Sequence, residues 1–252
     1  MDGSKKAFFK LTVIAALSVT LASQATAEEV MVKGNRFSAA GNYDSTGIDN
    51  SGYLNIDGNM NITGPFSNRV GGNINVSMGL NISGSTLTAS NSGALTAASY
   101  WSNGHFNNNA GAVASLGVMK SSGNMRNAGT LSMLQESVVA DFNGSGGTTN
   151  ITVTKIDYFN NMNPLLSATG KIRLDSDSKI VINVSEGVLT STMRDVVIAV
   201  SGDDLEFNNS SENRVFDRSH HFITSGSDFM KVTNIEMSVY GIMADFELKR
   251  KK

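Results

Sequence analysis

Asn-Ser-Gly-Tyr-Leu at residues 50–54 is the first copy of a short motif that recurs along the chain. Three of the four steps between successive copies have the same length, about 18 positions. The further copies are a degraded one that begins at Asn68, followed by Asn91-Ser92-Gly93-Ala94-Leu95, Asn109-Ala110-Gly111-Ala112-Val113 and Asn127-Ala128-Gly129-Thr130-Leu131. A recurrence of this length is typical of a solenoid, in which each repeat forms one circuit of a coil.

Within and between the motif copies, apolar and polar residues alternate with the period of two that is typical of a β-strand. The alternation is unbroken between Asn73 and Ser83, and it recurs at residues 54–56, 60–62, 151–153 and 180–184. In the longest run the residues predicted to face inward are Ile74, Val76, Met78, Leu80 and Ile82. We therefore expect many short strands with small polar residues on their outer face.

Equivalent positions in successive circuits of such a coil lie one strand spacing apart, about 4.8 Å. We predict a buried ladder in which each side-chain amide donates to the next, formed by Asn50, Asn68, Asn91, Asn109 and Asn127. The longer step from Asn68 to Asn91 then contains five extra residues that bulge outward. The alternative is that the Asn-Gly pairs mark hairpin turns of an ordinary β-sandwich.

Composition supports a β-protein that is rich in turns. Asn, Ser and Gly make up one third of the 252 residues; they are unfavourable in helix interiors and suit tight turns. The chain has no cysteine, which excludes disulfides, thiolate zinc sites and a cysteine nucleophile. Its formal net charge of −2 speaks against a nucleic-acid-binding protein.

Residues 1–27 have the pattern of a secretory signal peptide. Three lysines precede an apolar run at residues 11–22, and Ala25 and Ala27 are small residues suited to signal peptidase. A membrane-spanning helix needs about 20 apolar residues, so neither this run nor any later segment is expected to form one. We predict an exported mature chain, residues 28–252, at the cell surface, in the medium or in the periplasm.

Charge divides this mature chain, which we expect to be a single elongated domain. Residues 30–134 contain eight charged side chains, whereas residues 135–252 contain 28. We assign low-charge circuits to about 44–134, and more charged circuits with a C-terminal cap to 135–252. Caps are expected because the end strands of a solenoid expose unpaired backbone groups, and residues 30–43 and the stretch from Lys231 are the candidates.

The three histidines do not lie in a recognisable catalytic or metal-binding motif. His105 is isolated, and the adjacent side chains of His220 and His221 would point to opposite faces of a strand. We expect the pair to lie in a solvent-exposed turn.

Two acidic clusters could bind a hard cation, as acidic residues do in β-helix enzymes that cleave polysaccharides. Asp175 and Asp177 would face the same side of a strand, and a second group contains Asp203, Asp204 and Glu206. Calcium needs about six to eight oxygen ligands, and no calcium-binding repeat is present. The simpler interpretation is charged turns and solvated strand faces, so we predict no catalytic, cofactor-binding or metal-binding residue.

The motif copies and the segment from Leu166 to Ile180 resemble the passenger domains of autotransporters and related filamentous-haemagglutinin-like adhesins. The resemblance covers Asn50 to Phe207. It implies a right-handed parallel β-helix at a bacterial cell surface, used for adhesion or as a stalk. No sequence for a C-terminal translocator barrel follows before Lys252, so a truncated passenger is expected.

Three functional hypotheses follow from these observations. The first is a non-enzymatic adhesin whose repeated polar side chains bind glycans or proteins of host or neighbouring cells at many weak points. The second is a secreted carbohydrate-active β-helix, of lyase or hydrolase type, that uses Asp175 and Asp177. The third is an inert passenger remnant. The missing catalytic motifs favour the first, without a cofactor or a nucleic-acid partner, and the oligomeric state stays open.

Overall fold

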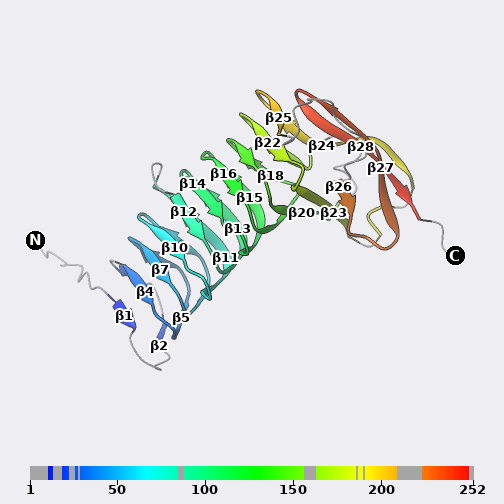
Figure 1. Cartoon of the computed structure of the whole chain (residues 1–252). Coiled ribbons are helices and arrows are strands. Elements are labelled where there is room, and N and C mark those ends of the chain that lie inside the picture. Colours follow the sequence, from blue (N-terminus) through cyan, green and yellow to red (C-terminus); the bar gives the residue numbers. More distant parts are fainter. Residues whose placement is uncertain are drawn as a thin grey trace, which may run out of the picture.

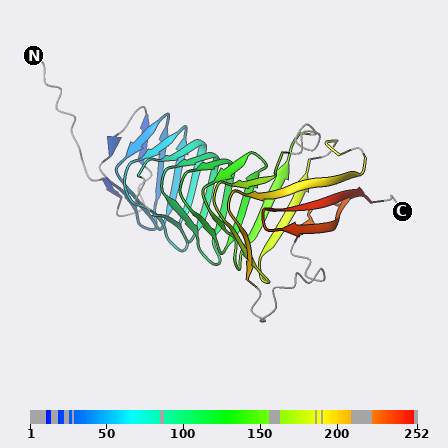
Figure 2. The same cartoon turned by 90° about the horizontal axis from the view of Figure 1, so that it is seen from above.

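The computed structural model describes residues 29–84, 88–155, 163–185, 187–189, 191–208 and 223–249, together with the backbone of residues 11–13, 19–22 and 26–27. Within these residues it contains strands and no helix. The strands form circuits that stack along one axis, with β1 at one end and the β27–β28 hairpin at the other (Figures 1 and 2). The prediction of an all-β parallel solenoid is confirmed, and the β-sandwich alternative is wrong.

One side of the coil, in the described part of the chain, is a parallel sheet of ten short strands, which we call the first sheet. Each circuit contributes one strand, and strands that are neighbours in space come from successive circuits. In spatial order they are β1 (Leu11–Val13), β4 (Val30–Val32), β7 (Ile48–Asn50), β10 (Phe66–Asn68), β12 (Thr88–Asn91), β14 (His105–Asn108), β16 (Met125–Asn127), β19 (Phe142–Asn143), β22 (Ile172–Asp175) and β25 (Leu205–Asn208).

The rest of each circuit forms a second sheet, in which a long strand in one circuit pairs with two shorter strands in another. Its strands on the N-terminal side are β2 (Val19–Ala22), β3 (Thr26–Ala27), β5 (Arg36–Ala40), β6 (Tyr43–Ser45), β8 (Tyr53–Asp57), β9 (Met60–Ile62), β11 (Asn73–Ile82), β13 (Ala94–Ser102) and β15 (Val113–Ser121). It continues through β17 (Thr130–Leu134), β18 (Ser137–Val139), β20 (Thr148–Val153), β21 (Leu166–Ala168), β23 (Lys179–Val184), β24 (Met193–Ser201), β26 (Ile223–Ser225), β27 (Met230–Ser238) and β28 (Gly241–Leu248).

The alternating apolar residues fill the inside of the coil. Ile74, Val76, Leu80 and Ile82 of β11 are all buried, as predicted, but Met78 is 55% exposed. The reason is a register shift between Val76 and Gly79 in the pairing of β11 with β13. The extra residue there turns the strand around a corner of the coil and reverses the side to which Met78 points.

The predicted ladder of side-chain amides lies at the corner where strands of the first sheet end. Each Nδ2 donates to Oδ1 one circuit further on: Asn50 to Asn68 at 2.8 Å, Asn68 to Asn91 at 2.7 Å, Asn91 to Asn108 at 2.8 Å and Asn108 to Asn127 at 2.9 Å. All five residues are at most 1% exposed. Asn127 ends the column by donating to Thr149 Oγ1 at 3.1 Å. The column satisfies amides that would be costly to bury alone.

The fourth member of this column is Asn108, and the prediction of Asn109 is wrong. Asn109 is half-buried beside the column, where its Nδ2 donates to Ser90 Oγ at 3.0 Å and to Ser92 Oγ at 2.8 Å. Asn108 is the last residue of β14 and pairs in register with Asn91 and Asn127. Its side chain therefore points inward, whereas that of the next residue does not.

The recurrence fades after Leu131: the step from Arg126 to Asn143 still has an ordinary length, but the circuits beyond Asn143 become longer. In the first sheet Asn143 pairs with Arg173, and Arg173 pairs with Glu206. One circuit therefore runs from position 143 to 173 and the next from 173 to 206, each longer than any step of the asparagine column. Their additional residues include 156–162, which lie outside the described part of the chain.

The stretch from Lys231 forms most of an antiparallel hairpin at the C-terminal end of the second sheet. β28 pairs antiparallel with β24 on one side and with β27 on the other, unlike the parallel pairs before it. The outer strand β27 has a register shift between Thr233 and Glu236. A bulge and charged residues on an outer strand discourage further strand addition, which suits the predicted capping role.

Residues 30–43, the other candidate cap, lie inside the stack of strands. β4 pairs with β1 and β7, and β5 pairs with β2 and β8. This segment is thus an ordinary circuit with the backbone of 11–13 and 19–22 on its outer side. It becomes the terminal circuit only in a chain from which the predicted signal peptide has been removed.

A buried carboxylate stabilises the C-terminal hairpin. Asp245 of β28, 5% exposed, accepts from the backbone N–H of Asp195 at 3.1 Å and from Nδ2 of Asn234 at 2.6 Å. These two partners have positive φ angles of 54° and 46° and lie at bulges in the two flanking strands. The hydrogen bond from Asn234, followed by that from Asp195, lowers the pKa of Asp245.

We expect Asp245→Ala to lower the free energy of unfolding by about 2 kcal/mol, because it removes two hydrogen bonds to a charged acceptor that is itself buried. Since the folded-state pKa is lowered, this contribution is present at neutral pH and is lost as the pH falls below the ordinary aspartate value of about 3.9. Urea unfolding at pH 7 and at acidic pH measures both effects. Glu247→Ala, which removes a surface ion pair with Lys231, is the control and should change stability little. Equal losses for the two variants would contradict this role of Asp245.

Candidate functional site

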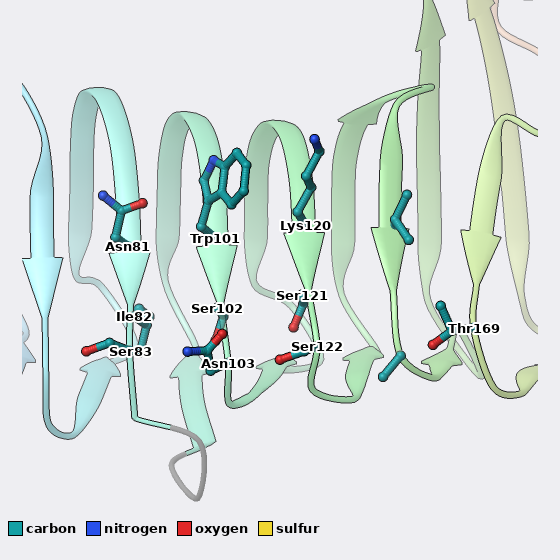
Figure 3. Close-up of a pocket in the computed structure, with 12 residues that line it drawn as sticks. Asn81, Ile82, Ser83, Trp101, Ser102, Asn103, Lys120, Ser121, Ser122 and Thr169 are labelled. Atoms are coloured by element: carbon teal, nitrogen blue, oxygen red, sulfur yellow. The ribbon is translucent and has the colours of Figure 1, made fainter.

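Three different side chains lie side by side on the outer face of the second sheet. Asn81 of β11, Trp101 of β13 and Lys120 of β15 occupy equivalent positions in successive circuits. Figure 3 shows them standing in one row on neighbouring strands. Each step along such a row is one strand spacing, about 4.8 Å. The sheet thus presents an amide, an aromatic ring and an ammonium group in a line parallel to the coil axis.

This row forms one side of a groove of about 710 Å³. The other side is a second row of outward residues, each of which follows the last residue of β11, β13, β15, β18 or β21. Between the rows lie buried residues such as Ser102 and Ser121, whose hydroxyls accept from the backbone of Gly104 and Gly123 at 3.0 Å and 3.1 Å. The second row consists of Ser83, Asn103, Ser122, Ala140 and Thr169.

Trp101 and Lys120 form a cation–π pair inside the groove. Lys120 Nζ lies 5.0 Å from the centre of the indole ring, and the tryptophan remains 48% exposed. Among the described residues no carboxylate forms an ion pair with Lys120, and Lys120 has the only formal charge among the residues that line the groove. A stacked cation of this kind is only partly neutralised, so it can still attract an anion.

Asn81 presents an acceptor to this groove. Its Nδ2 donates to Asn61 Oδ1 at 2.7 Å, and Asn61 in turn donates to Asp44 at 2.7 Å. These two bonds run toward the N-terminal end of the coil. In the described part of the chain, Asn81 Oδ1 has no hydrogen-bond partner, so it is available to a hydroxyl donor.

The predicted acidic clusters have structural roles. Asp175 ends β22, and its Oδ1 accepts from the backbone N–H of Asp177 at 3.1 Å, from that of Gly146 at 3.0 Å and from Ser178 Oγ at 2.9 Å. The expectation that Asp175 and Asp177 face the same side of a strand is wrong, because the chain turns after Asp175. The simpler interpretation, a charged turn, fits this geometry.

The second acidic group does not converge on a pocket either. Glu206 accepts from Lys171 Nζ and from Arg173 Nε, both at 2.7 Å, and these hydrogen bonds lower its pKa. Oδ2 of Asp204 lies 3.9 Å from Nζ of Lys171, while Asp203 is an exposed residue in a bend. The group is a partly exposed ion-pair network across two strands of the first sheet.

Of the three histidines and the two alanines of the predicted cleavage site, the structure describes His105 and the backbone of Ala27. His105 begins β14, and its Nδ1 accepts from the backbone N–H of Asn124 at 3.0 Å. His220, His221 and Ala25 lie outside the described residues, and the backbone of Ala27 lies in β3. In the described ranges, no group of three or more His, Asp or Glu side chains is placed to hold a metal ion. No helix there has the length and hydropathy needed to cross a membrane.

No protein-family model, curated protein or solved structure matches the chain. The fold is therefore established by the strand pairing alone. The likeness to autotransporter passengers rests on the motif copies and on this coil, and it supports a proposal of function only.

Proposed function

We propose that the protein is an exported, adhesin-like β-solenoid that binds other surfaces without catalysis. The observation that carries this proposal is the outer surface, where amide and hydroxyl side chains repeat from circuit to circuit. Besides the bonds of Asn61 and Asn81, Nδ2 of Asn75 donates to Asn55 Oδ1 at 2.6 Å. Stacked polar rows of this kind offer many equivalent hydrogen-bonding groups along one direction.

Repetition turns weak contacts into useful affinity. A single surface hydrogen bond contributes only about 0.5–1.5 kcal/mol net, but linked contacts act together when the partner also repeats. The partners that fit are surface glycans and proteins with repeating structure. The resemblance to autotransporter passengers and the signal-peptide pattern both support a location at the cell surface or outside the cell.

Adhesion is tested by comparing cells that carry the gene with cells from which it has been deleted. We expect deletion to reduce attachment to glycan-coated or matrix-coated surfaces and cell–cell aggregation, and re-expression of the gene to restore both. Beads coated with the purified chain should attach to the same surfaces. Unchanged attachment of the deletion strain, together with inert beads, would rule out the adhesin proposal.

Export is tested by fractionating cells and sequencing the N-terminus of the protein. We expect the protein outside the cytoplasm, with Glu28 as its first residue, because cleavage is predicted after Ala27. Ala25→Asp and Ala27→Asp together should block cleavage and leave a larger, membrane-associated precursor. A cytoplasmic protein that retains Met1 would contradict the proposed export.

A further inference from the structure

We infer that the groove beside Trp101 and Lys120 is a binding site for a linear acidic glycan, a polymer of hexuronic acid, lying parallel to the coil axis. This inference rests on the proposed function and names the ligand class for one site. It concerns a single groove, whereas the adhesin proposal concerns the repeating outer surface as a whole.

The first argument is the position of Trp101. Outward positions in the low-charge circuits are mostly occupied by Asn, Ser, Thr and Gly, yet here the protein's single tryptophan is half exposed. An indole ring in an open groove offers a flat apolar surface with a polar edge. A sugar ring has an apolar C–H face of similar size and hydroxyls around its rim, and an apolar platform flanked by a few polar groups is the usual design of small-molecule sites.

The second argument is the charge of Lys120. Within the described ranges no carboxylate pairs with it, and the surrounding circuits contain few charged residues, with eight between residues 30 and 134. A carboxylate on the ligand would form a charge-assisted hydrogen bond, which is about twice as strong as a neutral one. Because Lys120 can make this stronger bond only to an anionic ligand, its charge favours a uronic acid over a neutral sugar.

The third argument is the alignment of the groups. Asn81, Trp101 and Lys120 follow one another at one-circuit steps, so an acceptor, a stacking surface and a cation lie along about 10 Å of the coil axis. Hydroxyls and an amide line the opposite side of the groove at Ser83, Asn103 and Ser122. A chain of sugars lying along the groove would meet these groups in succession, while a compact ligand would reach only part of them.

The test uses the fluorescence of Trp101, which is the only tryptophan in the chain. Purified protein is titrated with polygalacturonate and, as the matched neutral ligand, with fully methyl-esterified polygalacturonate of the same length. We expect the acid form to change the tryptophan emission with saturation and the ester to bind at least about 10-fold more weakly, the factor lost with one charge-assisted hydrogen bond.

Variants assign the binding to the groove. Lys120→Gln should weaken binding of the acid form about 10-fold and leave the weak binding of the ester unchanged. Trp101→Ala, followed by calorimetry, should abolish both. Lys179→Gln removes an exposed lysine of β23, outside the groove, and should bind as the wild type does. Equal binding of acid and ester, no binding of either, or equal losses in the two lysine variants would overturn the inference.

Cell attachment separates this inference from the proposed function. If cells with the Trp101→Ala chain attach as well as the wild type, the groove is not the adhesive site although the adhesin proposal stands. If deletion of the gene leaves attachment unchanged while the purified protein binds polygalacturonate through Lys120, the adhesin proposal fails and the groove assignment stands.

Discussion

Asn91→Ala is expected to lower the free energy of unfolding by about 3–5 kcal/mol, the largest effect of any change considered for this chain. Asn91 lies in the middle of the amide column. Its removal deprives Asn68 Nδ2 of one acceptor and leaves Asn108 Oδ1 and the carbonyl of Val113 without the donor that reaches them at 2.8 Å and 3.2 Å. Each buried polar group left unpaired costs about 1–3 kcal/mol. Urea unfolding followed by circular dichroism measures the loss.

Asn109→Ala is the matched control for this prediction. It removes the same side chain from the neighbouring position outside the column, where the amide donates to two serine hydroxyls. We expect a loss of about 1 kcal/mol or less. A cost for Asn109→Ala equal to that for Asn91→Ala would show that the column has no special role in stability.

Gly93→Ala is expected to lower the free energy of unfolding by about 3 kcal/mol. A Cβ at this position would overlap the carbonyl oxygen of Gly72 in the preceding circuit and would lie 2.7 Å from that of Arg69. Both obstacles are backbone, so two circuits would have to move apart. Gly93 therefore leaves room for the neighbouring circuit and does not serve to permit an unusual φ.

Gly111→Ala provides the comparison. Gly111 has a φ of +79°, and a Cβ added there would meet nothing within 4 Å, so the substitution strains only its own backbone. About 1 kcal/mol is expected from that strain. Unfolding curves that place Gly111→Ala below Gly93→Ala in stability would contradict the close stacking of circuits at Gly93.

The sequence predicts the repeat because the asparagines of the column recur, and a closely packed glycine follows Asn50, Asn91 and Asn127 two positions later. It does not identify one ladder residue, because residues 107–109 are all asparagine and the regular spacing favours the last of them. The residue six positions after a ladder asparagine faces inward. Ala114, six positions after Asn108, is buried, whereas Ser115, six positions after Asn109, is exposed. The alternation of apolar and polar residues in the sequence therefore favours Asn108.

The sequence does not predict the corner at Met78 or the longer circuits of the C-terminal half. Alternation continues unbroken through residues 73–83, so nothing in the pattern marks the bulge that exposes Met78. Beyond Asn143 the circuits become longer, while their strands in the first sheet stay in register. A periodicity search fails when the inserted lengths differ from circuit to circuit.

The groove is formed by the register in which the strands pair, and no sequence motif marks it. Trp101 and Lys120 are distant in the sequence and belong to different strands, and only the pairing of β13 with β15 places them together. A lone tryptophan at an outward position among small polar residues was the available signal. The aromatic ring and the charge in the groove come from Trp101 and Lys120, which occupy outward positions where most circuits have small polar residues.

The central claim is that each circuit lies on the preceding one at a constant step. Met31, Asn107 and Asn143 lie in one outer row of the first sheet, with Asn107 four steps and Asn143 six steps from Met31. Because the chain has no cysteine, spin labels can be attached to pairs of introduced cysteines at these positions. Pulsed electron spin resonance should give distances of about 19 Å for 31–107 and about 29 Å for 31–143, a difference of two strand spacings. Two equal distances, or a 31–143 distance shorter than the 31–107 distance, would contradict the stacked coil.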